Sequence, residues 1–180
     1  MRIDHVLLTA APGFEPLPGG RHPGMGTANE IVPLRDTYLE LMRIVDEDEA
    51  AHSLFGRLAA ARSGFLGFCV GTDDLDAVCA RLGLEAFAAS RVRPDGVELR
   101  WRLAGVAEAV AEPGRPFFIE WDVPPEAHPG RSGPPQGELV AVESPADLRD
   151  WLGGAELPIL RGPGGAAVRR PGSTLPEWIR

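Results

Sequence analysis

Two otherwise apolar strand segments each contain one glutamate: Glu40 in TYLELM and Glu120 in PFFIEW. Because strand side chains alternate between two faces, Glu40 shares a face with Tyr38, and Glu120 shares one with Phe118. A carboxylate on such a face must be paired, hydrogen-bonded, metal-bound or shifted in pKa, because burying a bare charge is prohibitive. We therefore consider Glu40 and Glu120 candidate catalytic residues, the alternative being structural carboxylates with buried partners.

Further polar residues lie on the first strand, in a glycine-rich loop and on a later strand. His5 lies in RIDHVLLTA; the loop GGRHPGMGTAN contains His22, Thr27 and Asn29; and Arg100 lies in GVELRWRL. The loop residues are candidates for a substrate-binding rim, where a histidine could shuttle a proton, or else for an ordinary turn. Arg100 is either a bidentate contact for an acidic substrate or part of a solvated face.

The elements that must position these residues follow from the apolar pattern. In the first third of the chain, the pattern predicts a strand, a Gly/Pro-rich loop, two strands and a helix, over residues 2–10, 11–26, 27–34, 37–45 and 46–62. The next block predicts a strand, a helix and three strands: 63–72, 73–83, 96–103 and a pair within 107–123 that turns at Pro113–Gly114.

The rest of the chain begins with a segment rich in proline and glycine. Residues 124–137 are predicted to be a linker, in which His128 is expected to be solvated. After it, the pattern predicts a strand, a helix and two strands over residues 138–143, 144–153, 157–162 and 166–171. Residues 138–180 are too apolar to stay exposed, so we expect them to pack on the body.

The composition excludes several classes of protein. At 180 residues the chain is expected to form one domain. Its net charge of −8 argues against a nucleic acid or an anionic membrane surface as partner. No lysine is present, which excludes Schiff-base chemistry. No apolar run reaches the roughly 18 residues of a membrane span. Cys69 and Cys79 lack metal-ligand spacing, so we expect a reducing, cytoplasmic location.

Three motifs, in this order, resemble the glyoxalase-like domain of the vicinal oxygen chelate superfamily: IDHV, GGRHPGMGTAN and YLEL. The segment FFIEW resembles the second module of that superfamily. The resemblance implies an α+β fold in which paired βαβββ modules form a cup-shaped mixed sheet. The expected boundaries are 1–62 for module one, 63–123 for module two, 124–137 for the linker and 138–180 for a partial third βαββ unit.

The resemblance also implies a ligand set for one divalent metal ion. Ligands in metal-dependent members come from the first and last strand of each module, which here correspond to His5, Glu40 and Glu120. The fourth position falls near Gly67, in a strand without His, Gln or Glu. One histidine and two carboxylates can hold a divalent metal with open positions. The alternative is a metal-free cup in which His5 and a glutamate contact each other.

Two functions remain open at this point. The first is a metal-dependent lyase or isomerase of the glyoxalase-like group that acts on a small molecule with neighbouring oxygen functions. The second is a metal-free module that binds or sequesters a small molecule without catalysis. The expected partner is a small-molecule ligand in either case, and a homodimer is also compatible with the resemblance.

Overall fold

The computed structural model describes residues 1–180 and contains twelve strands and four α-helices. The first third of the chain forms β1 (Arg2–Leu8), β2 (Leu17–His22), β3 (Thr27–Pro33), β4 (Tyr38–Ile44), α1 (Glu47–His52) and α2 (Leu54–Ala60). The middle third forms β5 (Phe65–Gly71), α3 (Leu75–Leu82), β6 (Phe87–Val92), β7 (Glu98–Ala104), α4 (Val106–Ala111) and β8 (Phe117–Trp121). The last third forms two 3₁₀ turns, η1 (Pro125–Ala127) and η2 (Pro129–Arg131), and then β9 (Glu138–Ser144), β10 (Ile159–Arg161), β11 (Gly165–Arg169) and β12 (Glu177–Ile179).

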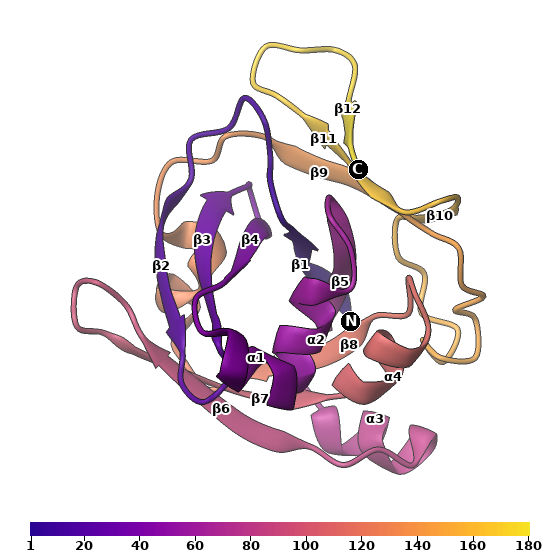
Figure 1. Cartoon of the computed structure of the whole chain (residues 1–180). Coiled ribbons are helices and arrows are strands. Elements are labelled where there is room, and N and C mark those ends of the chain that lie inside the picture. The colour runs from indigo at the N-terminus through magenta and orange to yellow at the C-terminus, as the bar shows by residue number, and fades with distance from the viewer.

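Eight strands form one mixed sheet in the order β2-β3-β4-β1-β5-β8-β7-β6. The two halves of this order repeat each other. β1 is parallel to β4 and β5 is parallel to β8, while β1 and β5 meet antiparallel at the centre. The sheet curls until β2 and β6, at its two ends, approach each other (Figure 1). The α+β class with paired modules and a cup-shaped sheet is therefore confirmed.

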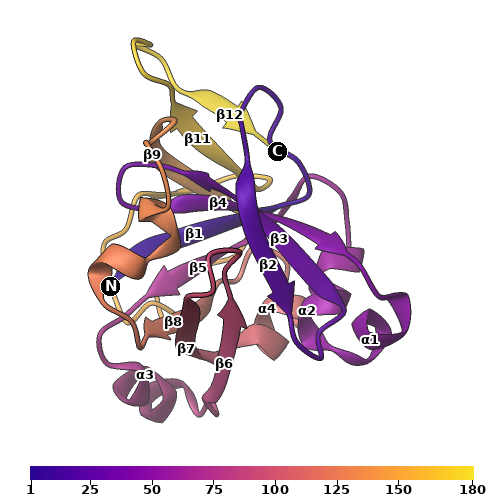
Figure 2. The same cartoon turned by 90° about the vertical axis from the view of Figure 1, so that its left-hand side faces the viewer.

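The C-terminal strands form a second sheet, in the order β10-β9-β11-β12, against the outside of the first (Figure 2). Val142, Trp151 and Val168 belong to the same buried apolar cluster as Val6 and Phe118. Burial of apolar area is the main source of stability, so this shared core ties the two sheets together. The expectation that residues 138–180 pack on the body is confirmed.

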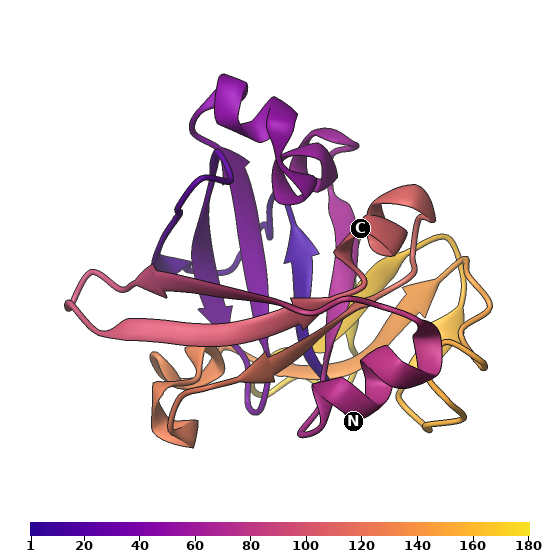
Figure 3. The same cartoon turned by 90° about the horizontal axis from the view of Figure 1, so that it is seen from below.

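A second apolar cluster fills the concave side of the large sheet. It includes Leu7, Phe55, Leu99 and Phe117, which come from β1, α2, β7 and β8. Helices α1 and α2 lie at one end of the cup, and α3 lies on the opposite side of the molecule (Figure 3). No helix of the structure has the length and apolar character that crossing a membrane requires.

The middle of the chain differs from its predicted element pattern in two places. Residues 87–92 form β6, which the sequence did not predict because FAASRV is short and lacks alternation. Residues 106–111 form α4 instead of a strand. The alternation in AEAVA suggested a strand, but its alanines favour a helix.

The first third also differs from its prediction. β2 lies inside the segment predicted to be a loop. The helix predicted over 46–62 is divided at Ser53, whose hydroxyl accepts from the N–H of Gly56 and caps α2. The same hydroxyl donates to the carbonyl of Met25. This bond anchors the junction between α1 and α2 to the loop between β2 and β3.

The prediction of a helix over residues 144–153 is wrong, because the structure has no helix there. Only single turns form there, such as the one closed by the Leu152 N–H on the Leu148 carbonyl at 2.8 Å. The Asp147 carboxylate accepts from the N–H of Arg149, a local turn that competes with a helix. The third unit is thus four strands without an α-helix.

Residues 124–137 form a strap against the large sheet instead of a free linker. Pro129 and Gly130 of η2 are buried and pack beside β3. The side chain of His128 is only 12% exposed and reaches the carboxylate of Asp4. The expectation that His128 is solvated is therefore wrong.

Candidate functional site

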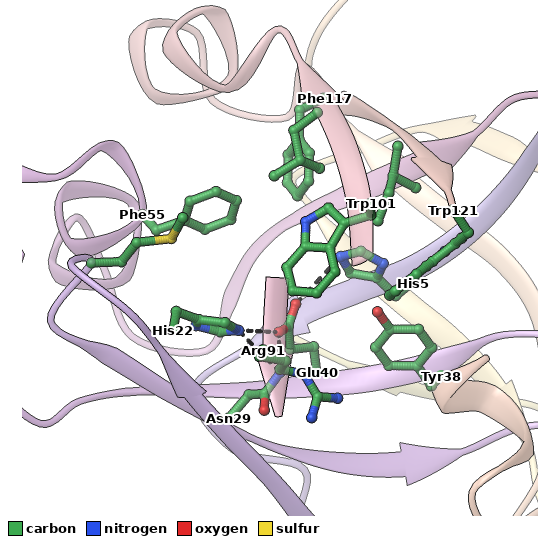
Figure 4. A pocket seen from close by; sticks show the side chains of 13 residues that line it. His5, His22, Asn29, Tyr38, Glu40, Phe55, Arg91, Trp101, Phe117 and Trp121 are labelled. Atoms are coloured by element: carbon green, nitrogen blue, oxygen red, sulfur yellow. Dashed lines mark hydrogen bonds and ion pairs between the residues drawn. The ribbon is translucent and has the colours of Figure 1, made fainter. Parts of the chain in front are cut away.

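The concave side of the large sheet contains a cavity between the two halves of the cup (Figure 4). The cavity is small, about 30 Å³, and its mouth opens to solvent. One half of the cup contributes most of the polar lining and the other contributes mostly aromatic and aliphatic side chains. The lining residues are His5, His22, Met25, Asn29, Tyr38, Glu40, Phe55, Arg91, Trp101, Leu103, Phe117, Ile119 and Trp121.

Asp4 and His5 are adjacent residues whose side chains are both buried and in contact. The pairing of β1 with β5 is irregular between Ile3 and His5. His5 Nδ1 lies 2.8 Å from Asp4 Oδ1, and the other carboxylate oxygen of Asp4 accepts from Trp121 Nε1 at 3.1 Å. His128 Nε2 lies 3.2 Å from that same oxygen. The Asp4 carboxylate therefore accepts hydrogen bonds from residues of β1, β8 and the strap.

These contacts determine the charge state of Asp4. Burial by itself raises the pKa of Asp4, but the hydrogen bonds from His128 and His5 outweigh that effect and hold the pKa well below its usual value. Asp4 is thus ionised at neutral pH. An ionised Asp4 requires a proton on His5 Nδ1, and this fixes the orientation of the His5 ring.

The other ring nitrogen of His5 faces Glu40. His5 Nε2 lies 3.3 Å from Glu40 Oε2, and both side chains are less than one-tenth exposed. The imidazole edge of His5 therefore lies beside the Glu40 carboxylate, and the two attract each other whenever both nitrogens of His5 carry a proton.

Glu40 Oε1 is held from the opposite side by Asn29, whose amide also contacts His22. Asn29 Oδ1 accepts from the N–H of Gly20 at 2.9 Å, so its amide group must donate. Asn29 Nδ2 lies 2.5 Å from Glu40 Oε1 and 3.3 Å from His22 Nε2. His22 Nε2 is consequently an acceptor, and its Nδ1 donates to the hydroxyl of Thr27 at 2.9 Å. Burial also lowers the pKa of His22, which agrees with a neutral ring.

Aromatic rings enclose the His5–Glu40 pair. Tyr38 stacks on His5 with ring centroids 4.7 Å apart, and Phe117 meets His5 edge-on at 5.8 Å. Burial, aided by the nearby charge of Glu40, raises the pKa of the Tyr38 phenol well above its ordinary value, so it stays protonated. Trp101 and Trp121 complete the wall with centroids 5.3 Å apart. Such surroundings exclude water and strengthen electrostatic interactions.

Arg91 on β6 is the one arginine among the buried polar residues, and it is 4% exposed. No carboxylate lies within 4.0 Å of its guanidinium, and its Nη1 atom has no hydrogen-bond partner. The backbone of Gly20 lies close to it: a Cβ on Gly20 would stand 3.3 Å from Arg91 Nη1 and 2.9 Å from the Val92 carbonyl. Glycine at that position allows β2 and β6 to approach.

Four of the predicted residues line the cavity together: His5, His22, Asn29 and Glu40. Thr27 is fully buried behind them and orients His22 instead of lining the cavity. The glycine-rich segment is therefore a pair of strands that places His22 and Asn29 inside the cup, while Arg21 lies outside and pairs with Glu49. The chemical roles of these residues remain predictions.

The prediction that Glu120 joins His5 and Glu40 is wrong. On β8, the residues that line the cavity are Phe117, Ile119 and Trp121, so Glu120 points to the outer face. There Glu120 accepts from the N–H of Leu75 at the start of α3 and pairs with Arg102 at 3.0 Å. Its carboxylate stabilises a helix N-terminus and an ion pair.

The prediction of Arg100 as a substrate contact is also wrong. On β7, Trp101 and Leu103 face the cavity, which places Arg100 on the outside. The Arg100 side chain is 56% exposed and pairs with Glu98 and Asp122. This is the solvated alternative considered from the sequence.

Sequence reasoning missed Asp4, Tyr38 and Arg91 as parts of the site. Asp4 stands beside His5 in IDHV, and an acidic residue next to a candidate histidine was an available signal. Tyr38 lies on the same strand face as Glu40, so the alternation in TYLELM was an available signal for it. Arg91 lies on β6, for which the apolar pattern predicts no strand, so no sequence signal pointed to it.

The donor set does not fit the metal ion that the resemblance implied. By register, the residues of the second half that match His5 and Glu40 are Cys69 and Ile119, of which isoleucine has no donor atom. The amide of Asn29 directs its hydrogens at Glu40 and His22, where a cation between those two would lie. No group of three or more His, Cys, Asp and Glu side chains is placed to hold a metal ion.

Comparisons with known proteins agree with this architecture. The chain belongs to the glyoxalase-like domain family, whose model matches residues 6–150. It is similar in fold to the crystal structure of a hypothetical protein from Staphylococcus aureus, with a TM-score of 0.66 and 15% identity over 98% of this chain and 88% of the other. No curated protein matches the chain.

Proposed function

We propose that this protein binds a compact oxygenated molecule in the cup and that the His5–Glu40 pair moves a proton to and from it. The observation that supports the proposal is the approach of His5 Nε2 to Glu40 Oε2, which are 3.3 Å apart on the wall of a cavity. Asp4 orients His5, and Asn29 orients Glu40. A carboxylate and an imidazole positioned in this way are suited to general acid–base catalysis.

The reaction class that fits is proton transfer at a carbon next to a carbonyl group. The Glu40 carboxylate takes the proton from that carbon, the C–H electron pair forms a C=C bond, and the carbonyl π electrons move to oxygen. The imidazolium of His5 offsets the charge on that oxygen. Return of the proton to the same carbon gives exchange, and return to the neighbouring carbon after a proton shift gives isomerisation.

A second candidate is a cup that binds its ligand without chemistry. The apolar half of the lining, from Trp101, Leu103 and Ile119, favours it, since apolar walls with few polar groups are typical of small-molecule sites. In that case the contact between His5 and Glu40 only shapes the pocket. The alternatives differ in whether Glu40 is needed for turnover.

Deuterium exchange separates the two candidates. We would incubate the protein in D₂O with pyruvate, hydroxyacetone, dihydroxyacetone and glycolaldehyde and follow loss of the C–H signals by NMR. We expect exchange with at least one compound, and Glu40→Gln should slow it by roughly 10²–10⁴-fold. Glu120→Gln is the matched control, because Glu120 lies outside the cup and the change should leave the exchange rate intact.

Three results would contradict the acid–base proposal. Absence of exchange with every compound would favour the binding module. Equal exchange by the wild type and Glu40→Gln would show that Glu40 is not the base. Exchange that appears only after addition of Mn²⁺ or Zn²⁺, and disappears with a chelator, would restore the metal-dependent alternative.

A further inference from the structure

Arg91 differs from the other charged residues of the protein in being buried and unpaired. Its side chain lines the cavity with Glu40, His5 and Tyr38, and residue exposure is only 4%. Arg115, the other arginine with an unsatisfied nitrogen, pairs with Glu112 and lies over Trp151, so its charge is compensated. A buried guanidinium without an anion costs stability unless a partner arrives.

The protein itself does not supply that partner. Asp4 is occupied by His5, His128 and Trp121, and Glu40 contacts His5 and Asn29. Neither carboxylate lies within 4.0 Å of the Arg91 guanidinium, so the charge of Arg91 on the cavity wall has no close partner. The charge of Arg91 is felt inside the cup, since it helps to lower the pKa of His22.

We propose that Arg91 binds the carboxylate of the ligand, so that the molecule held in the cup is a compact carboxylic acid with a second oxygen function. The inference rests on the proposed function, since it assigns a substrate class to the same cavity. A guanidinium offers two parallel N–H donors that match the two oxygens of a carboxylate. When the ligand carboxylate is bound to Arg91, the second, oxygen-bearing carbon of the ligand can lie next to His5 and Glu40.

A carboxylate suits this site better than a phosphate group. Arg91 is the only arginine in the lining, and Glu40 is part of the same wall. A singly charged carboxylate would be neutralised by one guanidinium. A phosphate dianion would keep an uncompensated charge in a buried site beside a carboxylate. The apolar residues opposite, Trp101 and Phe117, leave no further cation to balance it.

The test compares acids with their neutral amides. Trp101 and Trp121 line the cavity, so intrinsic fluorescence reports on its occupation. We would titrate acetate, acetamide, pyruvate, pyruvamide and inorganic phosphate into the wild type, Arg91→Gln, Arg91→Lys and the control Arg100→Gln, and record melting temperatures in parallel. Arg100 is a matched control because it is an exposed arginine on the neighbouring strand β7.

We expect pyruvate to bind the wild type at least ten-fold more tightly than pyruvamide. Arg91→Gln should abolish that difference, Arg91→Lys should keep part of it, and Arg100→Gln should keep all of it. Without ligand, Arg91→Gln should melt higher than the wild type, because it removes an unpaired buried charge. A purely structural role for Arg91 would instead lower the melting temperature and leave the preference for acids unchanged.

The outcomes distinguish this inference from the proposed function. Equal binding of acid and amide by the wild type, or tighter binding of phosphate than of pyruvate, would overturn the assignment of a carboxylate. If neutral ketones then exchange deuterium in a Glu40-dependent manner, the proposed function stands without the inference. If pyruvate binds through Arg91 but no compound exchanges, the inference stands and the catalytic proposal fails.

Discussion

Replacing Asp4 with asparagine should destabilise the protein strongly, although Asp4 never contacts solvent or the cavity directly. The change keeps the shape of the side chain but removes the charge that accepts from His5, Trp121 and His128 at 2.8, 3.1 and 3.2 Å. Removing one partner from a buried charged network costs about 3–5 kcal/mol. This is a large part of the roughly 5–15 kcal/mol that stabilises a typical domain.

The effect of Asp4→Asn should depend on pH with a defined sign. The folded-state pKa of Asp4 lies below the ordinary 3.8, so its contribution is complete above that pH and is lost as the pH falls toward the folded-state value. The loss amounts to about 1.4 kcal/mol per pH unit. At pH 3, the gap between the wild type and Asp4→Asn should therefore be about 1 kcal/mol smaller than at pH 7.

Urea unfolding at pH 7 and pH 3 measures both quantities, provided that the m-values agree. Asp73→Asn is the matched control, since the Asp73 side chain is 98% exposed and the same change should alter stability by less than about 0.5 kcal/mol. If Asp4→Asn is as stable as Asp73→Asn, the buried network does not hold the strap and the His5 ring. A gap that widens on acidification would refute the assignment of a lowered Asp4 pKa.

Two further predictions concern regions outside the cup. A chain that ends at Gly137 should lose cooperative melting or solubility, because Val142 and Trp151 share a core with the large sheet; an unchanged melting curve would contradict this. Glu120→Gln should cost about 1 kcal/mol in urea unfolding, because its carboxylate holds Arg102 and the first turn of α3. Loss of ligand binding in Glu120→Gln would show that it acts on the cavity after all.

The two-module plan was implied by the resemblance of IDHV, GGRHPGMGTAN, YLEL and FFIEW to the family, and the apolar strand pattern of each half agrees with it. The sequence also predicted that Glu40 lies in a buried environment, since a single carboxylate interrupts TYLELM. The sequence did not predict two elements, β6 and α4. The segment of β6 is largely exposed and rich in small residues, and the segment of α4 alternates like a strand.

The face on which Glu120 lies could not be predicted from FFIEW. A strand has a period of two, so a shift of one residue transfers every side chain to the other face. Phe117 and Ile119 face the cup while Phe118 faces the second sheet, and both environments are apolar. An apolar pattern on both faces contains no information about which face lines the site. Register with β5 decided it.

The sequence by itself determined apolar strands that must be buried, with Glu40 among their buried residues, and its motifs implied by resemblance a mixed sheet with His5 inside the cup. Tertiary structure alone decided which charges meet. Asp4 contacts His128, 124 residues along the chain, and Arg91 reaches the cavity because the curled sheet carries β6 to β2. Contacts of that kind depend on sheet closure and strand register, which no short segment of the chain encodes.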